Sequence, residues 1–391
     1  MKDTPRNGMS IPSIPGVKIA AGIVASLVCQ LASAQSSVVL SGLVDDGITY
    51  TNNVKGHSVW RTDQGFAQSG RWGLKGIEEL GDGWAANFVL ENGFDINSGR
   101  LSQGGREFGR QARVGLTSAK FGTVSMGRQY DSVVDFLGPL TANGGWAGAP
   151  FSHPYDNDNT DNSFRVSNSL KYLSPNVYGF TGGTMFASGN DTDFSNNRAW
   201  SVGARYDRGP ILVGAAYLRA NRSGQTAAGA ISTTDAVISA QGQQIWGGGV
   251  NYKVGKGVIG LSYTNSVFYG PGMNNLTGIE YNGSKMSFQN IETSVRFFVK
   301  PNLLVGGMYT YTKGEHTESA GEQHTHWNQA GLMADYFLSK RSDLYAMAVW
   351  QRLGGDHTGA GGMQGALLLG AAGVSATSNQ VLVHAGIRVK F

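Results

Sequence analysis

The sequence predicts an all-β fold, a transmembrane antiparallel β-barrel of 16 strands, and three observations support this prediction. The chain has 391 residues, including 58 glycines, and only 15% of its residues are charged, which is low for a soluble protein of this size. Beyond residue 34, no apolar run reaches the length of about 18 residues that a membrane-spanning helix needs. Apolar and polar residues instead alternate, as in strands that are apolar on one face only.

The first 34 residues have the features of a secretory signal peptide, and we exclude them from the fold. Basic residues precede the apolar stretch Ile19–Cys29, and Ala32-Ser33-Ala34 forms an A-x-A cleavage site. A lipid-modified Cys29 is the competing interpretation, although the residue before it, Val28, is not small. Cys29 is the only cysteine, so residues 35–391, which we expect to form a single barrel domain, would contain neither a disulfide nor a thiolate metal site.

Short and long links alternate along the chain. Seven short segments rich in Gly, Pro, Asn or Asp are predicted to be hairpin turns, and long polar connections, such as Asn52–Ser69 and Lys313–Trp327, separate them. Outer-membrane barrels have this asymmetry, with short periplasmic turns and long external loops. Seven turns join fourteen strands, and one strand at each end gives about sixteen, enough for an aqueous channel. The predicted turns are Glu79–Gly83, Ser118–Gly122, Ser174–Asn176, Asp207–Pro210, Val254–Gly257, Lys300–Asn302 and Ser339–Ser342.

Alternation within the predicted strands separates two faces. In Ser287–Val299, for example, Ile291 and Val295 share one face, while Asn290 and Arg296 share the other. A soluble β-sandwich would alternate in the same way, so the pattern becomes specific only together with the signal peptide and the link lengths. The same alternation occurs in Trp200–Asp207, Ile245–Lys253 and Val381–Phe391.

Six short motifs follow one another along the first half of the chain: Ser41–Gly47, Ser69–Gly76, Glu78–Gly83, Phe108–Ala112, Val114–Leu116 and Gly127–Asp131. Together with the last strand and its terminal Phe391, they resemble Gram-negative general porins, most closely those of beta-proteobacteria. The similarity is densest over residues 37–175 and resumes at the end of the chain. The terminal strand resembles the signal that the barrel-assembly machinery of the outer membrane reads.

The resemblance implies a homotrimer of 16-stranded barrels in the outer membrane, in contact with lipid and lipopolysaccharide. In this family the third external loop, here about residues 131–164, folds inward and narrows the pore, and a ladder of arginines faces it. Arg71, Arg110 and Arg165 match the ladder. The implied function is passive diffusion of ions and small hydrophilic solutes.

The arginines predict a preference for anions. Guanidinium groups stay protonated, and on one wall of a constriction they raise the local concentration of anions. The loop carries no carboxylate between Phe136 and Tyr155, which leaves the arginines less opposed. Candidates for the facing acids are Asp45, Glu91, Asp131 and Asp135.

Two further arginines have less certain orientations. Strand parity places Arg110 on the inner face with Ala112 and Val114, so we expect Arg113 on the outer face, near the rim or against another subunit. Arg128 is expected either in the lumen or at a contact between subunits.

We expect no metal, no cofactor and no catalysis. His316, His324 and His326 lie near three glutamates, a combination that could bind a divalent metal, but a mobile external loop would not supply the supporting contacts around the ligands. Asp156, Asp158 and Asp161 alternate with asparagines and could bind Ca²⁺, but they lack the fixed spacing and the bidentate glutamate of a calcium loop. No nucleophile with an orienting histidine and no phosphate-binding loop is evident. The net charge of +4 is too small to indicate nucleic acid. The alternatives are a substrate-selective channel and a plugged barrel that serves as an adhesin or a structural protein.

Overall fold

The computed structural model describes residues 36–391 except 320, 357–362 and 364, so the predicted signal peptide lies outside the described residues. The first nine strands are β1 (Ser37–Val54), β2 (His57–Gln64), β3 (Arg71–Gly81), β4 (Trp84–Gly93), β5 (Gln111–Ser118), β6 (Gly122–Gln129), β7 (Val166–Leu173), β8 (Phe180–Ala187) and β9 (Ala199–Arg208). The others are β10 (Ile211–Asn221), β11 (Ile238–Val254), β12 (Gly257–Asn274), β13 (Ile279–Glu280), β14 (Lys285–Lys300), β15 (Leu303–Glu318), β16 (Gly321–Phe337), β17 (Ser342–Gly355) and β18 (Asn379–Lys390).

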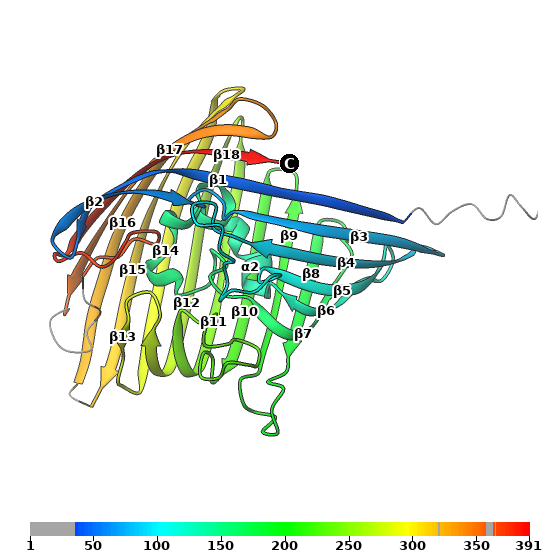
Figure 1. Ribbon diagram of the computed structural model, residues 1–391, viewed down its shortest axis with the longest axis horizontal. Helices are drawn as coiled ribbons and strands as arrows, with labels where there is room; N and C mark the ends of the chain where they lie inside the picture. Colours follow the sequence, from blue (N-terminus) through cyan, green and yellow to red (C-terminus); the bar gives the residue numbers. More distant parts are fainter. Residues whose placement is uncertain (1–35, 320, 357–362, 364) are drawn as a thin grey trace, which may run out of the picture.

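These strands form one closed antiparallel sheet (Figure 1). β1 pairs along one edge with β18 and along the other with β2 and then β3, so the first and last strands close the ring. β2 and β3 together occupy one position in the ring, and β13 is a short addition to the end of β12. The ring therefore has 16 positions, and the predicted fold class is confirmed. Among the described residues, no helix is both long enough and apolar enough to cross a membrane.

The lengths of the connections agree with the prediction at most places. All seven predicted turns lie between consecutive antiparallel strands. The long loops predicted at Asn52–Ser69 and Lys313–Trp327 were wrong, because strands continue into both segments. In the first, Lys55 and Gly56 form a tight turn with φ angles of 52° and 94°, a conformation that suits a two-residue hairpin. In the second, β15 runs to Glu318 and β16 begins at Gly321.

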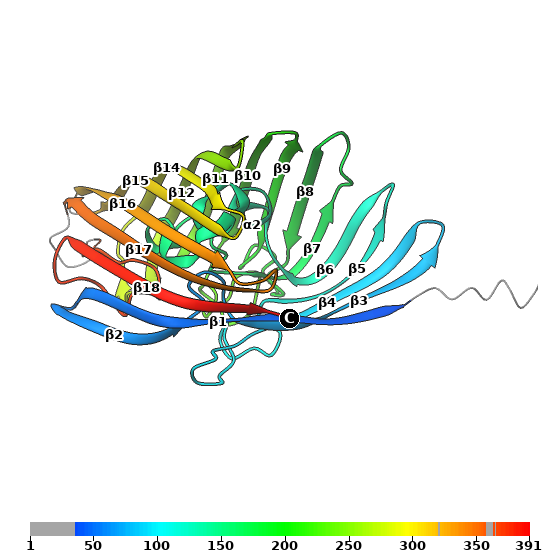
Figure 2. The same cartoon turned by 90° about the horizontal axis from the view of Figure 1, so that it is seen from above.

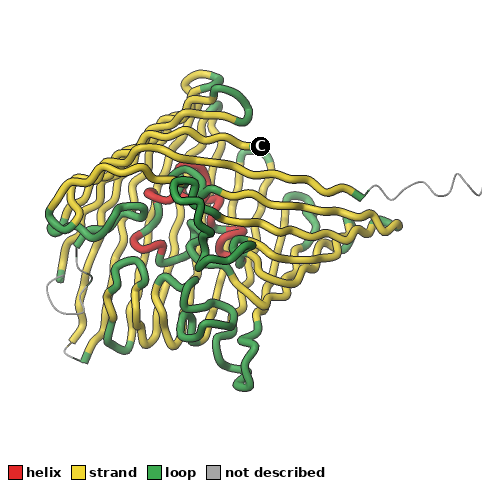
Figure 3. Tube along the Cα trace, in the orientation of Figure 1, coloured by secondary structure: helices red, strands yellow, loops and turns green. Residues whose placement is uncertain are grey.

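The third long connection, between β6 and β7, runs inside the ring of strands (Figures 2 and 3). It begins with the short helix α2 (Ser132–Phe136), which contacts β9 and β10. The carboxylate of Asp131 caps this helix by accepting hydrogen bonds from the backbone N–H groups of Val133 and Val134. Four further helical turns follow: Gly138–Leu140, Asn143–Ala147, Ala149–Phe151 and Pro154–Asp156.

Aromatic side chains of this connection fit against glycines of the inner wall. A Cβ atom at Gly203 of β9 would lie 2.4 Å from the ring of Phe136, and one at Gly331 of β16 would lie 2.4 Å from the ring of Phe151. Phe136 and Phe151 are buried, and both pack into hydrophobic clusters that the loop and the wall build together. Gly203 and Gly331 therefore form notches in the wall, which exist because glycine has no side chain to fill them.

A buried ion triad fastens the far half of the connection to β12 and β14. His153 Nδ1 lies 2.6 Å from a carboxylate oxygen of Asp158, and His153 Nε2 lies 3.4 Å from Glu292 of β14. The other oxygen of Glu292 accepts a hydrogen bond from the backbone N–H of Ala142 at 2.7 Å. Thr264 of β12 donates to Asp158. All of these groups are buried, so a protonated His153 offsets part of the negative charge of the two carboxylates away from water.

The glycine notches lead to a first prediction. Gly203→Val places a branched side chain where the ring of Phe136 now lies, and overpacking of this kind typically costs about 1–3 kcal/mol. We expect a lower midpoint of thermal unfolding in detergent. Gly182→Val on neighbouring β8 is the matched control, because the nearest atom to a Cβ there is 3.8 Å away. Equal midpoints for the two variants would contradict the role of the notch.

The triad leads to a second prediction. Burial lowers the pKa of His153, but Asp158 and Glu292 together raise it to about 10. Because the folded-state pKa lies above the unfolded value of about 6.5, the protonated His153 contributes its full stabilisation below pH 6.5. The free energy of unfolding then decreases as the pH rises to about 10, by up to about 1.4 kcal/mol per pH unit. His153→Asn removes the cation between two buried acids, so we expect lower stability at pH 6, by about 3–5 kcal/mol, and a flatter dependence up to pH 10.

Denaturant unfolding of the wild type and the variant at several pH values measures this effect. His57→Asn, which changes an exposed histidine at the start of β2, is the control and should follow the wild type. If the wild type and His153→Asn lost stability equally as the pH rises, the triad would be excluded as the source of the pH dependence.

Candidate pore constriction

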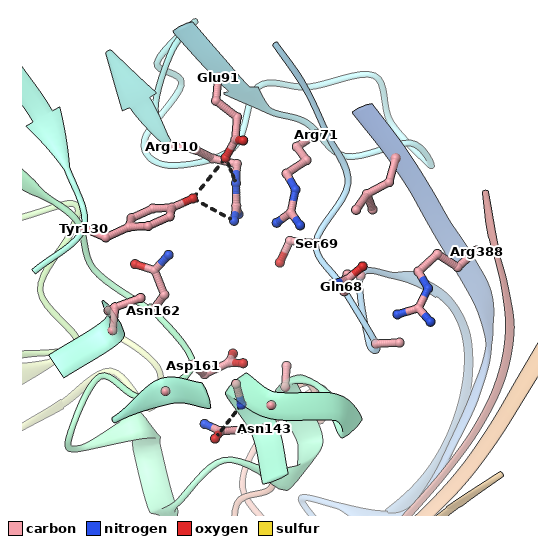
Figure 4. A pocket seen from close by; sticks show the side chains of 18 of the residues that line it. Gln68, Ser69, Arg71, Glu91, Arg110, Tyr130, Asn143, Asp161, Asn162 and Arg388 are labelled. Atoms are coloured by element: carbon pink, nitrogen blue, oxygen red, sulfur yellow. Dashed lines mark hydrogen bonds and ion pairs between the residues drawn. The ribbon is translucent and has the colours of Figure 1, made fainter. Parts of the chain in front are cut away.

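The inward connection and the facing wall enclose a cavity of about 910 Å³. Residues from β1, β3, β4 and β18 line one side of this cavity, and residues of the inward connection line the other. In Figure 4, Arg71 and Arg110 extend from the wall into the space that Asn143 and Asp161 border from the loop. The cavity therefore brings the three predicted arginines, Arg71, Arg110 and Arg165, to one place.

Arg110 is held by an acid and a phenol. Its Nε donates to the carboxylate of Glu91 on β4 at 2.8 Å, and its Nη2 lies 3.3 Å from the hydroxyl of Tyr130. The same hydroxyl donates to Glu91 at 3.0 Å, so the three groups form a closed set (Figure 4). This set spans β4, the residue before β5 and the residue after β6, and it fixes the guanidinium at the cavity wall.

Arg71 and Arg165 are held less tightly. Among the described residues, Arg71 at the start of β3 has no hydrogen bond or ion pair through its side chain. Arg165, just before β7, donates only to the backbone carbonyl of Ser163, at 3.4 Å. Both guanidinium groups must keep their charge, and no described carboxylate pairs with either. Both side chains therefore line the cavity without an ionic partner among the described residues.

The predicted acids fall into two groups. Glu91 lines the cavity, whereas Asp45 and Asp131 are fully buried and do not. Asp45 accepts hydrogen bonds from the backbone N–H of Gln68 and the hydroxyl of Tyr345, and so fastens the segment between β2 and β3. Asp131 caps α2. These two carboxylates thus hold the backbone beside the pore.

Asp161 is the acid of the inward connection that borders the cavity. It is half-buried, and among the described residues its carboxylate has no ion pair. Burial raises its pKa to about 7, although Arg165 and Arg110 act in the opposite direction. Its charge is therefore sensitive to pH near neutrality, unlike that of the arginines.

A second cavity of about 800 Å³ adjoins the first and shares Lys75 and Tyr130 with it. Asp135 borders this cavity and pairs with Lys171 of β7. Arg113 also lines it and donates to Asn87 at 3.2 Å.

The expectation that Arg113 points outward was therefore wrong. Val114 and Leu116 are 60% and 48% exposed and form the outer face of β5, so Arg113 lies on the inner face. The error arose because Arg110, whose side chain does enter the lumen, precedes the first residue of β5, and strand parity cannot be counted from it.

Arg128 belongs to neither cavity. It is buried, and it forms two hydrogen bonds to Asp235 in the connection between β10 and β11, at 2.6 and 3.1 Å. Its Nε donates to the carbonyl of Gly109 at 2.7 Å. Arg128 therefore joins loops within the chain, and it is not exposed for a contact between subunits.

Basic groups outnumber acidic groups along the two cavities. Nine basic and four acidic side chains line them, and three of the acids are already paired: Glu91, Asp135 and Asp335. Asp335 of β16 pairs with Arg388 of β18, at 3.1 Å. Among the described residues, the basic groups without an ion pair are Arg71, Lys75, Arg113, Arg165, Arg205 and Lys390.

The possible metal ligands noted in the sequence are divided between faces or used internally. His316 is buried on the inner face of β15, whereas Glu315, Glu322 and His324 meet on the outer face, where donor atoms lie within 4.8 Å of one another. Lys313 already pairs with Glu315 at 2.6 Å. In the inward connection, Asp158 belongs to the His153 triad, and Asp156 accepts backbone hydrogen bonds from Asp161 and Ser163.

Sequence reasoning missed several cavity residues. Arg388 and Lys390 of the last strand line the cavity but were not predicted in the constriction, although the alternation in Val381–Phe391 was a sufficient signal. Asp161 was considered only as a calcium ligand. No sequence pattern indicated Tyr130 or Asp335, since their roles depend on pairs with residues that are distant in sequence.

Comparison with known proteins agrees with this geometry. The family described as Gram-negative porin matches residues 20–356. An outer membrane porin protein of Bordetella pertussis is 34% identical over 235 residues, which is 52% of this chain and 59% of that protein. Outer membrane porin protein 32 of Delftia acidovorans is 33% identical over 198 residues, which is 46% of this chain and 53% of that protein. The matched regions thus span little more than half the length of these curated relatives.

Solved structures extend the similarity of fold over nearly the whole chain. An anion-selective porin from Comamonas acidovorans has a TM-score of 0.71 with 23% identity, over 91% of this chain and 100% of that one. OmpT of Vibrio cholerae has a TM-score of 0.61 with 15% identity, over 92% and 99%. At these identities the likeness concerns the fold alone. Since the family match covers most of the barrel, the chain belongs to the Gram-negative porin family.

Proposed function

We propose that this protein is a general diffusion porin of the outer membrane that carries ions and small hydrophilic solutes passively and prefers anions. The observation that carries the preference is the excess of unpaired basic groups along the two adjoining cavities. The solved structure of an anion-selective porin with the same fold supports this proposal.

The constriction selects by electrostatics and by width. A fixed set of guanidinium and ammonium groups produces a positive potential in the lumen, and low-dielectric walls focus it. Anions are concentrated there, and cations are repelled. Because the groups bind an ion only weakly and at several points, a solute leaves as readily as it enters. No bond is made or broken, so the channel needs no catalytic residue.

Further proposals follow from family membership. Residues 1–34 act as a signal peptide, residues 35–391 form the barrel, and about 131–164 form the constriction loop. The chain assembles as a homotrimer and reaches the membrane through recognition of its C-terminal Phe391 by the assembly machinery. Lipid and lipopolysaccharide surround the outer wall.

Single-channel recording in a planar bilayer tests the proposal. Ohmic conductance in steps of three supports a trimeric diffusion channel, whereas a current that saturates with one solute supports the alternative of a substrate-selective channel. Absence of conductance would reject both and support a plugged barrel with an adhesive or structural role.

Arg71 leads to a selectivity prediction. Arg71→Ser removes one charge from the cavity, and because the side chain has no partner among the described residues, the fold should not change. One charge at about 6 Å in water stabilises chloride by about 0.7 kcal/mol and destabilises potassium by about the same amount, so we expect the ratio of chloride to potassium permeability to fall about tenfold. The reversal potential in a KCl gradient measures this ratio.

Arg208→Ser is the matched control, because Arg208 is exposed at the end of β9 and lines neither cavity. An unchanged ratio in Arg71→Ser would remove Arg71 from the selectivity site. A reversal potential of cationic sign in the wild type would reject the anion preference itself.

Asp161 leads to a prediction about pH. Since its pKa is raised to about 7, the carboxyl is neutral below that pH and ionised above it. Loss of the negative charge leaves the arginines opposed by one carboxylate fewer, so anion preference should increase as the pH falls from 8 to 6. Asp161→Asn should show the stronger preference at both pH values. A wild-type reversal potential that does not change across this range would contradict the prediction.

A further inference from the structure

A trough runs along the outer wall over β16, between β15 and β17. On one rung of the sheet, Ala330 of β16 lies between Tyr309 of β15 and Trp350 of β17. On the next rung, Gly307 and Ala348 flank the exposed Leu332. Small and large outward side chains therefore alternate, and the small ones leave a groove of about 690 Å³ with an almost wholly apolar lining.

The trough changes character where it continues toward the long loops. The next two outward residues of β16 are Asn328 and His326, and Arg352 of β17 lies beside Asn328. These residues line a polar pocket of about 630 Å³, which shares Tyr309 and Trp350 with the apolar groove. Tyr309 donates a hydrogen bond to Asn328 at 2.6 Å across the boundary. The two cavities therefore form one continuous site with an apolar half and a polar half.

Arg352 gives the polar half its charge. It is exposed, and among the described residues its side chain has no hydrogen bond or ion pair. The guanidinium cannot lose its proton, and its fork of donors matches the oxygens of a phosphate. The imidazole of His326, stacked on Tyr311 with ring centroids 6.2 Å apart, is a further donor in the same pocket.

The aromatic residues set the height of the site. Tyrosine and tryptophan on the outer wall of a transmembrane barrel mark the membrane interface. Tyr309 and Trp350 lie at the junction of the two cavities, so the apolar groove lies at the level of the hydrocarbon and the polar pocket at the level of the headgroups. An occupant must accordingly have an apolar chain and an anionic head.

We propose that this trough binds one phosphorylated lipid of the outer leaflet, with an acyl chain over Gly307 and Ala330 and the phosphate at Arg352 and His326. The proposal rests on the membrane location and not on the channel activity. Lys313 and Glu315, further along β15, pair with each other at 2.6 Å and leave the charge of Arg352 uncompensated.

Native mass spectrometry of the detergent-solubilised protein tests this site with three probes. Dioleoyl phosphatidic acid has both halves of the ligand, dioleoylglycerol lacks the phosphate, and glycerol 3-phosphate lacks the chains. We expect one phosphatidic acid per subunit, bound about tenfold more tightly than dioleoylglycerol, and no retention of glycerol 3-phosphate. Equal retention of the two lipids would overturn the proposed role of the phosphate.

Two variants locate the site. Arg352→Gln should weaken phosphatidic acid about tenfold, to the level of dioleoylglycerol, and Ala330→Leu should weaken both lipids by filling the groove. The controls are Arg208→Gln and Ala204→Leu on the outer face of β9, which should bind as the wild type does. Wild-type binding in both Arg352→Gln and Ala330→Leu would overturn the proposal. A change of subunit stoichiometry in Ala330→Leu would also overturn it, because it would show that a second copy of the chain occupies the trough. Conductance should be unchanged in all four variants, which separates this test from that of the pore.

Discussion

The docking of the inward connection on the barrel wall is the interaction on which the pore depends. A segment of more than thirty residues lies inside a closed sheet, and its position decides the width and the charge of the passage. Aromatic rings in glycine notches hold its first half and its middle, and the triad of His153, Asp158 and Glu292 holds its second half. Apolar packing alone would allow the loop to slide, whereas buried ionic groups are satisfied in one arrangement only. The constriction is therefore part of the folded core.

The same docking explains the imbalance of charge. Acidic groups of the lumen are largely occupied with structural tasks: Asp131 caps a helix, Asp135 pairs with Lys171, and Asp158 belongs to the triad. Six basic groups along the two cavities have no such task among the described residues, because arginine and lysine side chains on a strand can extend into water without a partner. The proposed selectivity thus follows from the basic groups that the fold leaves without an ionic partner. The total number of charges in the chain, with a net value of +4, would not have indicated it.

The barrel could be predicted from the sequence because its rules are local. A period of two and the residues of tight turns are visible in any window, and both were correct for strands such as β14. The failures have physical causes. Strands extend beyond the membrane wherever polar residues can still pair, so Lys313–Trp327 was mistaken for a loop. The partners of the constriction loop lie more than a hundred residues away, as Glu292 does from Ala142, and no local pattern indicates them. The arginines were found through family resemblance, whereas Asp161 needed the fold.

The wall of the barrel is a single sheet, so consecutive residues of a strand face the lumen and the outer surface in turn. On β16, Gly331 makes room for Phe151 on the inside, and its neighbour Ala330 forms the floor of the trough on the outside. On β15, Gly306 lies against Trp146 on the inside, and Gly307 opens the groove on the outside. Since adjacent side chains point to opposite faces, a substitution at one position alters one environment and leaves the other intact. The wall can therefore hold the loop that determines conduction and, independently, a lipid that conduction does not require.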